Sequence, residues 1–207
     1  CLSALQGGRV GTPGTPVNDS NGCGGLTRMA PAGLACLQAG PAFDAGCRLA
    51  ALTHGHPDGY LAAGTFAALV SSIISGKPLV QSIDRSCRIL EKADHAGQTL
   101  KAIDTAVNMA DKPVHDSEAI AAIGSGWTAD EALAISLYSS LVHEDEYEKA
   151  VLLAVNHSGS STSTGSITGS ILGALHGTAA IPSHWVSGLE LKEIIQEVAA
   201  DLFEQFK

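Results

Sequence analysis

Apolar residues recur every three or four positions along most of this chain, starting near Ala32. This spacing places them on one face of an α-helix, which turns once in about 3.6 residues. The clearest apolar stripes are Val80, Ile83, Cys87 and Leu90, then Leu100, Ile103, Val107 and Ala110, and then Leu133, Ile135, Tyr138 and Leu141. No alternation of apolar and polar residues is long enough to indicate a strand. The pattern predicts an all-α protein, with residues 1–30 forming mainly loops.

Local signals predict where individual helices begin and end. Thr128 opens the sequence TADE, a capping-box pattern that starts a helix. Asp58 is expected to cap a buried helix over residues 59–75, and a further helix is expected to begin near Glu144. A last helix is expected over residues 189–203, and its apolar side would be formed by Leu191, Ile194, Ile195, Val198 and Leu202.

Glycine occurs at every fourth position of one predicted helix, at Gly165, Gly169, Gly173 and Gly177. A glycine in a helix interior costs about 1 kcal/mol relative to alanine, so we expect each to permit a close approach. For Gly173 and Gly177 we expect packing against another helix. For Gly165, which adjoins a polar loop, the approaching group could be a helix or a ligand.

The composition fits a single helical domain over residues 1–207. Aromatic residues make up only 4% of the chain, and we expect Trp127 and Trp185 to anchor the core. The formal charge of −9 argues against a nucleic-acid partner, because phosphate binding needs clustered Lys and Arg. The uncharged run over residues 59–76 is borderline in length for a membrane span. Its Ser, Thr and Gly content favours a buried helix, and no membrane partner is expected.

The five cysteines are odd in number and show no CxxC spacing. This favours reduced thiols in the cytoplasm over a disulfide framework or a zinc site. One alternative function rests on Cys1, which could be the exposed nucleophile of a self-processed hydrolase. That hypothesis predicts a base close to Cys1 and loss of activity in Cys1→Ala.

Three clusters of small polar residues interrupt the predicted helices. The first, NDSNGCGG (18–25, the glycine-rich loop), offers unobstructed backbone N–H groups to a phosphate or a ribose. The second, THGHPD (53–58), could be a metal site but is more typical of a capping turn. The third, NHSGSSTSTG (156–165, the serine-rich loop), looks like a metal-binding loop without carboxylates. No Asp, Glu, Lys or Arg occurs over residues 151–189.

These clusters and their flanking segments resemble the ADP-ribosylglycohydrolase family, which includes the dinitrogenase-reductase-activating glycohydrolases. The resemblance is carried, in order, by NDSNGCGGLTRMAPAGL (18–34), LTHGHPDGYLAAG (52–64), GSGWTADEALAISLY (124–138), VNHSGSSTSTGSITGSILGALHG (155–177) and IPSHW (181–185). It implies a compact orthogonal bundle of helices around a cleft with two magnesium ions. There the family hydrolyses the glycosidic bond between ADP-ribose and a protein side chain or a small acceptor.

The serine-rich loop departs from the family's metal motif, which reads approximately Gly-Asp-Ser-Asp-Ser/Ala-Thr-Gly. Ser160 and Thr162 stand at the positions of its two aspartates, and Thr164 stands at that of its ligand threonine. Two hydroxyl groups are a poor replacement for the carboxylates that normally anchor magnesium, so we expect this chain alone to be weakly active or inactive. The family's other metal cluster belongs to an N-terminal segment that has no counterpart here, and a complementary N-terminal segment is therefore one expected partner.

The resemblance also implies a set of substrate-binding residues. Those that match the loop around the distal ribose and the diphosphate are Ser20, Asn21, Gly22, Cys23 and Gly24. His54 matches a family histidine near the substrate, although it could equally be a helix-terminal histidine bonded to a backbone carbonyl group. Gly159, in the serine-rich loop, completes the set. No catalytic residue is assigned.

Two interpretations within this family remain open. In the first, the chain is part of an active hydrolase of ADP-ribosyl linkages and is completed by a separate segment, which predicts a large exposed apolar surface. In the second, the chain is a pseudoenzyme that binds ADP-ribose or an ADP-ribosylated protein, or has a structural role. This second interpretation predicts a self-contained fold and no magnesium-dependent turnover.

Overall fold

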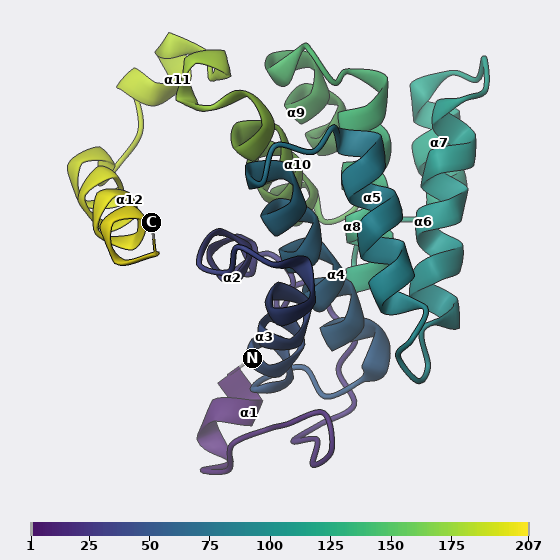
Figure 1. Ribbon diagram of the computed structural model, residues 1–207. Coiled ribbons are helices and arrows are strands. Elements are labelled where there is room, and N and C mark those ends of the chain that lie inside the picture. The colour runs from purple at the N-terminus through teal and green to yellow at the C-terminus, as the bar shows by residue number, and fades with distance from the viewer. Residues whose placement is uncertain (1, 207) are drawn as a thin grey trace.

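The computed structural model describes residues 2–206 and consists of helices joined by turns, with no strand in that range (Figure 1). The helices are α1 (Leu2–Gln6), α2 (Ala30–Leu34), α3 (Ala39–Ala51), α4 (Pro57–Ile74), α5 (Leu79–Leu90), α6 (Gly97–Ala110), α7 (Asp116–Ile123), α8 (Ala129–Val142), α9 (Tyr147–Val155), α10 (Ser161–His176), the 3-10 turn η1 (Thr178–Ala180), α11 (Ser183–Ser187) and α12 (Lys192–Phe206). The prediction of an all-α protein is confirmed. Cys1 lies outside the described residues, so the hypothesis of a Cys1 nucleophile stays a prediction.

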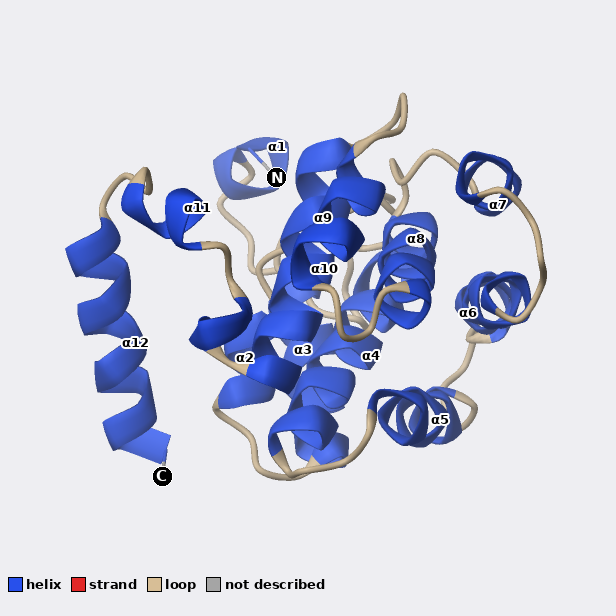
Figure 2. Ribbon diagram, turned by 90° about the horizontal axis from the view of Figure 1, so that it is seen from above, coloured by secondary structure: helices blue, strands red, loops and turns tan. Residues whose placement is uncertain are grey.

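Helix α4 is the centre of the fold, and its neighbours pack around it (Figure 2). Helices α2, α3, α5, α8 and α10 all contact it. Every residue of α4 from Gly59 to Ile73 is buried except Tyr60, which confirms that the uncharged run forms a core helix. Within residues 2–206, no helix combines the length and the apolar character that crossing a membrane requires.

Two glycines allow α3 and α4 to approach each other closely. A Cβ atom on Gly46 of α3 would lie 2.9 Å from the carbonyl oxygen of Ala63 and 2.9 Å from the Cα of Gly64. A Cβ atom on Gly64 of α4 would lie 2.8 Å from the carbonyl oxygen of Phe43 and would overlap the thiol of Cys47. Because these neighbours include backbone atoms, a larger residue at either position would force the two helices apart.

Most buried hydroxyl groups of the core helices are hydrogen-bonded within their own helix, whereas those of Thr99 and Thr168 have no hydrogen-bond partner among the described residues. Within the helices, hydroxyls donate to the carbonyl oxygen four residues earlier at Thr65, Ser72, Ser86, Ser136, Ser139 and Ser140. The Ser136 hydroxyl also lies 3.1 Å from the carbonyl oxygen of Thr164, which ties α8 to α10. Small hydroxyl side chains therefore let helices pack closely while satisfying their own hydrogen bonds.

The start of α4 differs from the prediction. Its N-cap is His56, whose Nδ1 accepts a hydrogen bond of 3.2 Å from the backbone N–H of Asp58, so the prediction of an Asp58 cap is wrong. Proline between these two residues fits the first helical position because its missing N–H would have no partner there. Helix α8 begins directly after Thr128 as predicted, although the Thr128 side chain makes no capping bond. Helix α9 begins at Tyr147, later than Glu144.

The first two glycines of the α10 series permit packing against α9. A Cβ atom on Gly165 would lie 2.5 Å from Cγ1 of Val155, and one on Gly169 would lie 3.0 Å from the hydroxyl oxygen of Tyr147. The Tyr147 hydroxyl also donates a hydrogen bond of 3.4 Å to the carbonyl of Gly169. Of the two alternatives for Gly165, the structure shows contact with a helix.

The last two glycines of the series do not pack against a helix. A Cβ atom on Gly173 or Gly177 would meet nothing within 4 Å, so the packing expected there is wrong. Gly177 instead ends α10 with φ +73°, a conformation that glycine adopts without the steric cost of a Cβ atom.

Neither tryptophan belongs to the buried core, contrary to the prediction that both anchor it. Trp127 is 62% exposed, so the expectation that it anchors the core is wrong. Trp185 is half-buried, and its ring centroid lies 6.3 Å from that of Tyr147. The large fully buried aromatic side chains are Tyr138 and Phe66, because a core built from Ala, Gly and Ser leaves few spaces of that size.

Helix α12 lies apart from the body of the molecule in both views (Figures 1 and 2). It forms the predicted amphipathic helix, shifted three residues along the chain, but none of its residues is buried. Its apolar side is exposed, with Ile194 at 54%, Val198 at 61% and Phe203 at 65%. The apolar side of the last described helix is therefore largely exposed.

The Gly64 contact can be tested with a pair of alanine substitutions. Gly64→Ala should lower the free energy of unfolding by about 1–3 kcal/mol, because the added methyl group overlaps α3. Gly40→Ala adds the same methyl group to α3 where nothing lies within 4 Å, and it should raise stability by about 0.5–1 kcal/mol. Urea denaturation followed by circular dichroism measures both, and equal effects of the two changes would contradict the packing argument.

Candidate functional site

The glycine-rich loop is held by the first residues of α4 and α8. The backbone N–H of Ala129 donates a hydrogen bond of 2.8 Å to the carbonyl oxygen of Asn21. The backbone N–H of His56 donates one of 3.3 Å to the carbonyl oxygen of Ser20. In the other direction, the N–H of Cys23 donates 3.1 Å to the carbonyl of Trp127. The loop thus supplies acceptors for N–H groups at helix starts, which lack partners within their own helix.

The same loop contacts the start of α10. The thiol of Cys23 lies 3.1 Å from the hydroxyl of Ser163 and 3.5 Å from that of Ser160. The Ser160 hydroxyl also donates 2.9 Å to the Ser163 hydroxyl, and all three side chains are buried. The N-termini of α4, α8 and α10 therefore meet around one loop. Each carries the partial positive charge of a helix dipole, which attracts anions, while the first turns of α4 and α8 also hold the carboxylates of Asp58 and Asp130.

His54 lies beneath the glycine-rich loop as a buried side chain, only 3% exposed. Its Nδ1 lies 2.8 Å from the hydroxyl of Thr53, and a Cβ atom on Gly25 would lie 3.0 Å from its ring. Burial lowers the pKa of His54 to about 4, and the guanidinium of Arg28 acts in the same direction. The imidazole is therefore neutral at physiological pH and supports the loop from below.

The serine-rich loop is pressed against the loop between α7 and α8. The backbone N–H of Ser160 donates 2.9 Å to the carbonyl of Ser125. A Cβ atom on Gly159 would overlap that carbonyl oxygen, so only glycine fits at this position. This contact gives Gly159 a structural role, and its predicted role in substrate binding stays a prediction.

The three residues at the family's metal positions engage different partners. The Ser160 hydroxyl faces Cys23, whereas Thr162 is exposed. The Thr164 side chain is fully buried. Its hydroxyl donates a hydrogen bond of 2.6 Å to the carbonyl oxygen of Ala154 and lies 3.0 Å from Nε2 of His157. These neutral groups do not fit magnesium, which needs several oxygen ligands with carboxylates among them. Over residues 2–206, no three side chains of His, Cys, Asp or Glu are grouped so that they could hold a metal ion.

Sequence reasoning missed a pair of carboxylates in the first turns of α4 and α8. Burial and the neighbouring carboxylate of Asp130 raise the pKa of Asp58. Asp130 is itself 4% exposed and accepts a hydrogen bond of 2.9 Å from Nε2 of Gln98. Oδ2 of Asp58 lies 3.5 Å from Nδ1 of His56. The two residues are far apart in sequence, and each was recognised only as part of a helix start.

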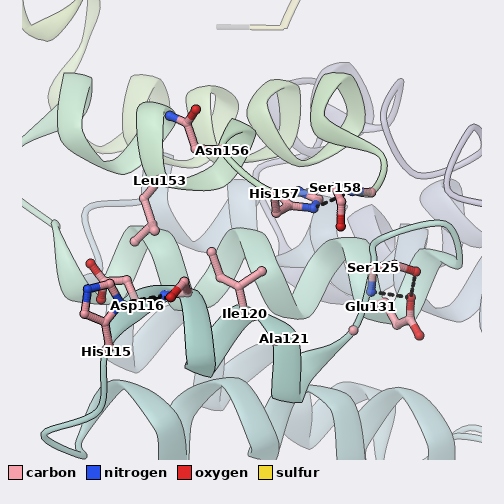
Figure 3. A pocket seen from close by; sticks show the side chains of 13 residues that line it. His115, Asp116, Ile120, Ala121, Ser125, Glu131, Leu153, Asn156, His157 and Ser158 are labelled. Atoms are coloured by element: carbon pink, nitrogen blue, oxygen red, sulfur yellow. Dashed lines mark hydrogen bonds between the residues drawn. The ribbon is translucent and has the colours of Figure 1, made fainter.

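A cavity of about 690 Å³ adjoins the serine-rich loop on the side of α7 and α9 (Figure 3). Ile120 and Leu153 point toward each other across it, and His157 lies on its wall. At one end, a carboxylate oxygen of Glu131 accepts hydrogen bonds from the N–H and the hydroxyl of Ser125 and from the N–H of the next residue. The capping-box pattern identified Glu131 but not this partner. A cavity of this size could hold a small molecule.

Comparison with known proteins supports one family and one fold. The sequence profile of a family described as ADP-ribosylglycohydrolase matches residues 1–207. A solved structure described as an "ADP-ribosylglycohydrolase-related protein complex" superposes with a TM-score of 0.80 and 24% identity. The match covers 100% of this chain and 68% of that chain. At this identity the structural likeness concerns the fold, and it confirms the expected helical architecture.

The buried state of His54 predicts a pH dependence of stability. The folded-state pKa of about 4 lies below the ordinary value of 6.5, so the unfolded chain binds a proton that the folded chain does not. The contribution of His54 to stability is therefore complete above that ordinary value and is lost progressively as the pH falls toward the folded-state pKa. Urea denaturation at about pH 7.5 and about pH 4.5 should show a smaller loss for His54→Gln than for the native chain. An equal loss in both would contradict the assignment.

Proposed function

Because this chain belongs to the ADP-ribosylglycohydrolase family, we propose that it binds the ADP-ribosyl group at the glycine-rich loop. The observation that carries this proposal is the meeting of three helix N-termini, those of α4, α8 and α10, around residues 18–25. A diphosphate carries the negative charge that helix dipoles favour at these N-termini. The carboxylates of Asp58 and Asp130, in the first turns of α4 and α8, oppose part of this attraction.

The exposed ring of Trp127 provides a second element of this proposal. Its backbone carbonyl is bonded to Cys23, so the residue is fixed next to the glycine-rich loop. Its side chain is 62% exposed, which is unusual for a residue of this size without a partner. An indole beside a diphosphate site can stack on an adenine base, since every base offers an aromatic face.

Hydrolysis by this chain alone is proposed to be slow or absent. The family's reaction uses two magnesium ions to position the substrate and activate water, according to the resemblance described above. Ser160 and Thr162 replace its aspartates, and the hydroxyls of Ser160 and Thr164 already have protein partners. The cluster of Ser160, Ser163 and Cys23 instead joins the start of α10 to the glycine-rich loop.

One observation favours the alternative of a hydrolase completed by another segment. That interpretation predicts a large exposed apolar surface, and the apolar side of α12 is such a surface. The pseudoenzyme interpretation predicts that the chain is stable by itself. A complementary segment that covers the exposed side of α12 and supplies carboxylates would account both for the missing metal ligands and for the exposed apolar residues.

Restoring the aspartates separates these alternatives. The native chain should show no magnesium-dependent release of ADP-ribose from an ADP-ribosylated arginine or serine substrate. Ser160→Asp/Thr162→Asp should gain thermal stability with magnesium, because two carboxylates enter the loop. Rescue of turnover only when an upstream family segment is added would support the completed hydrolase. Turnover by the native chain would exclude the pseudoenzyme.

The stacking role of Trp127 is tested by direct binding of ADP-ribose in isothermal titration calorimetry. Trp127→Ala should weaken binding about tenfold, since stacking contributes about 1–3 kcal/mol per base. Trp185→Ala removes the same ring away from the loop and should change the dissociation constant by less than about twofold. If neither the native chain nor the variants bind ADP-ribose at millimolar concentration, the binding proposal fails.

A further inference from the structure

A groove runs between α5 and α6, two helices that lie side by side in both views (Figures 1 and 2). Helix α5 packs on α4 and α6 packs on α8, while few direct contacts join α5 to α6. The groove has a volume of about 500 Å³. Its apolar lining consists of Val80, Ile83, Cys87, Ile103, Val107, Ala110 and Leu141. We call it the α5–α6 groove.

The rim of the α5–α6 groove is acidic. Its charged lining residues are Asp84, Glu91, Asp104, Asp111 and Glu144. None of the 12 Lys and Arg residues of the chain lines the groove. Asp84 forms an ion pair with Arg88 on the outer surface of α5, whereas no such pair is seen for the other four among the described residues. The groove thus combines an apolar floor with a net negative rim.

Three of these carboxylates lie at helix C-termini, where their charge lowers the stability of the folded chain. Glu91 is the C-cap of α5, Asp111 is the C-cap of α6, and Glu144 follows the C-cap of α8. The C-terminus of a helix carries partial negative charge, so each carboxylate there costs a few tenths of a kcal/mol to about 1 kcal/mol. Neutralisation by a cationic partner would relieve this repulsion at all three helix ends.

We propose that the α5–α6 groove binds a cationic amphipathic helix of another protein. The apolar side chains of such a helix would fill the floor over Ile83 and Ile103, and its Lys or Arg residues would reach the acidic rim. This is the arrangement by which amphipathic helices bind in grooves. The lining from Val80 to Glu91 extends about 16 Å along α5, which matches three helical turns of a partner.

The charges on this chain argue against a second copy as the occupant. The exposed amphipathic helix of the chain itself is α12, none of whose residues is buried, and its polar residues include Glu193, Glu197 and Asp201. These would face the acidic rim and repel it. Nucleic acids and anionic membranes carry the same sign of charge and are disfavoured for the same reason. The groove lies at the end of α8 opposite the glycine-rich loop, so this proposal does not depend on the proposed function.

The test uses the full chain and a synthetic helical peptide of about fourteen residues, with leucine at helical spacing and lysine beside it. Calorimetry should show saturable one-to-one binding. Asp104→Lys/Asp111→Lys should weaken it at least about tenfold at low salt, since both rim charges are reversed. The matched control, Glu193→Lys/Asp201→Lys, changes the net charge equally on α12 and should weaken binding less than about twofold.

A chemical footprint locates the bound peptide. Cys87 lines the groove and is half-buried, whereas the half-buried Cys36 lies beyond α2. The bound peptide should slow alkylation of Cys87, mapped by mass spectrometry, and leave Cys36 unchanged. Val80→Lys, at a residue that is 61% exposed, provides a second variant if the double change affects folding, and it should also weaken binding because it removes apolar contact and repels the cationic peptide.

Three outcomes would overturn the proposal. The first is an absence of saturable binding to the native chain. The second is equal weakening by the groove variant and the α12 control, which would indicate attraction to net charge only. The third is equal binding of a peptide with the same composition but scrambled apolar positions. ADP-ribose binding should be the same in the native chain and both charge variants, so failure here is distinguishable from failure of the proposed function.

Discussion

The close approach of α3 and α4 at Gly46 and Gly64 sets the distance between these helices and, through α4, the positions of most others. Because α4 is buried on nearly all sides, its neighbours must present small residues or hydroxyls that bond within their own helix. This requirement accounts for the scarcity of aromatic residues and the abundance of Ala, Gly and Ser. At the start of α4, His56 caps the helix next to the glycine-rich loop.

The candidate site follows from that arrangement. Once α4, α8 and α10 are packed together, their N-termini meet at one end of the bundle, and the loop over residues 18–25 closes over them. The helix ends supply positive potential, which the carboxylates of Asp58 and Asp130 in the first turns of α4 and α8 offset in part. The serine-rich loop has hydroxyls where the family has aspartates, and in the part of the chain that the structure describes no three His, Cys, Asp or Glu side chains are grouped so that they could hold a metal ion.

Helix positions and the order of the polar clusters could be predicted from sequence, because helical periodicity and small polar residues are local signals. Hydrogen-bond and packing partners that are distant in the sequence could not be predicted in this way. The capping box at Thr128 identified Glu131, but the acceptor role of its carboxylate toward Ser125 depends on how the preceding loop turns. The glycine series in α10 is uniform in sequence, yet only Gly165 and Gly169 face a neighbouring helix. The same local pattern thus serves packing in one half of a helix and not in the other.

The placement of the two tryptophans decides what the intrinsic fluorescence of this chain can report. Trp127 is exposed beside the glycine-rich loop, and Trp185 lies in α11 with its ring near that of Tyr147. Neither belongs to the buried core, whose fully enclosed aromatic rings are Tyr138 and Phe66. Indole emission is therefore a probe of the loop and of the C-terminal helices. Loosening of the core around α4 would change the tryptophan emission very little.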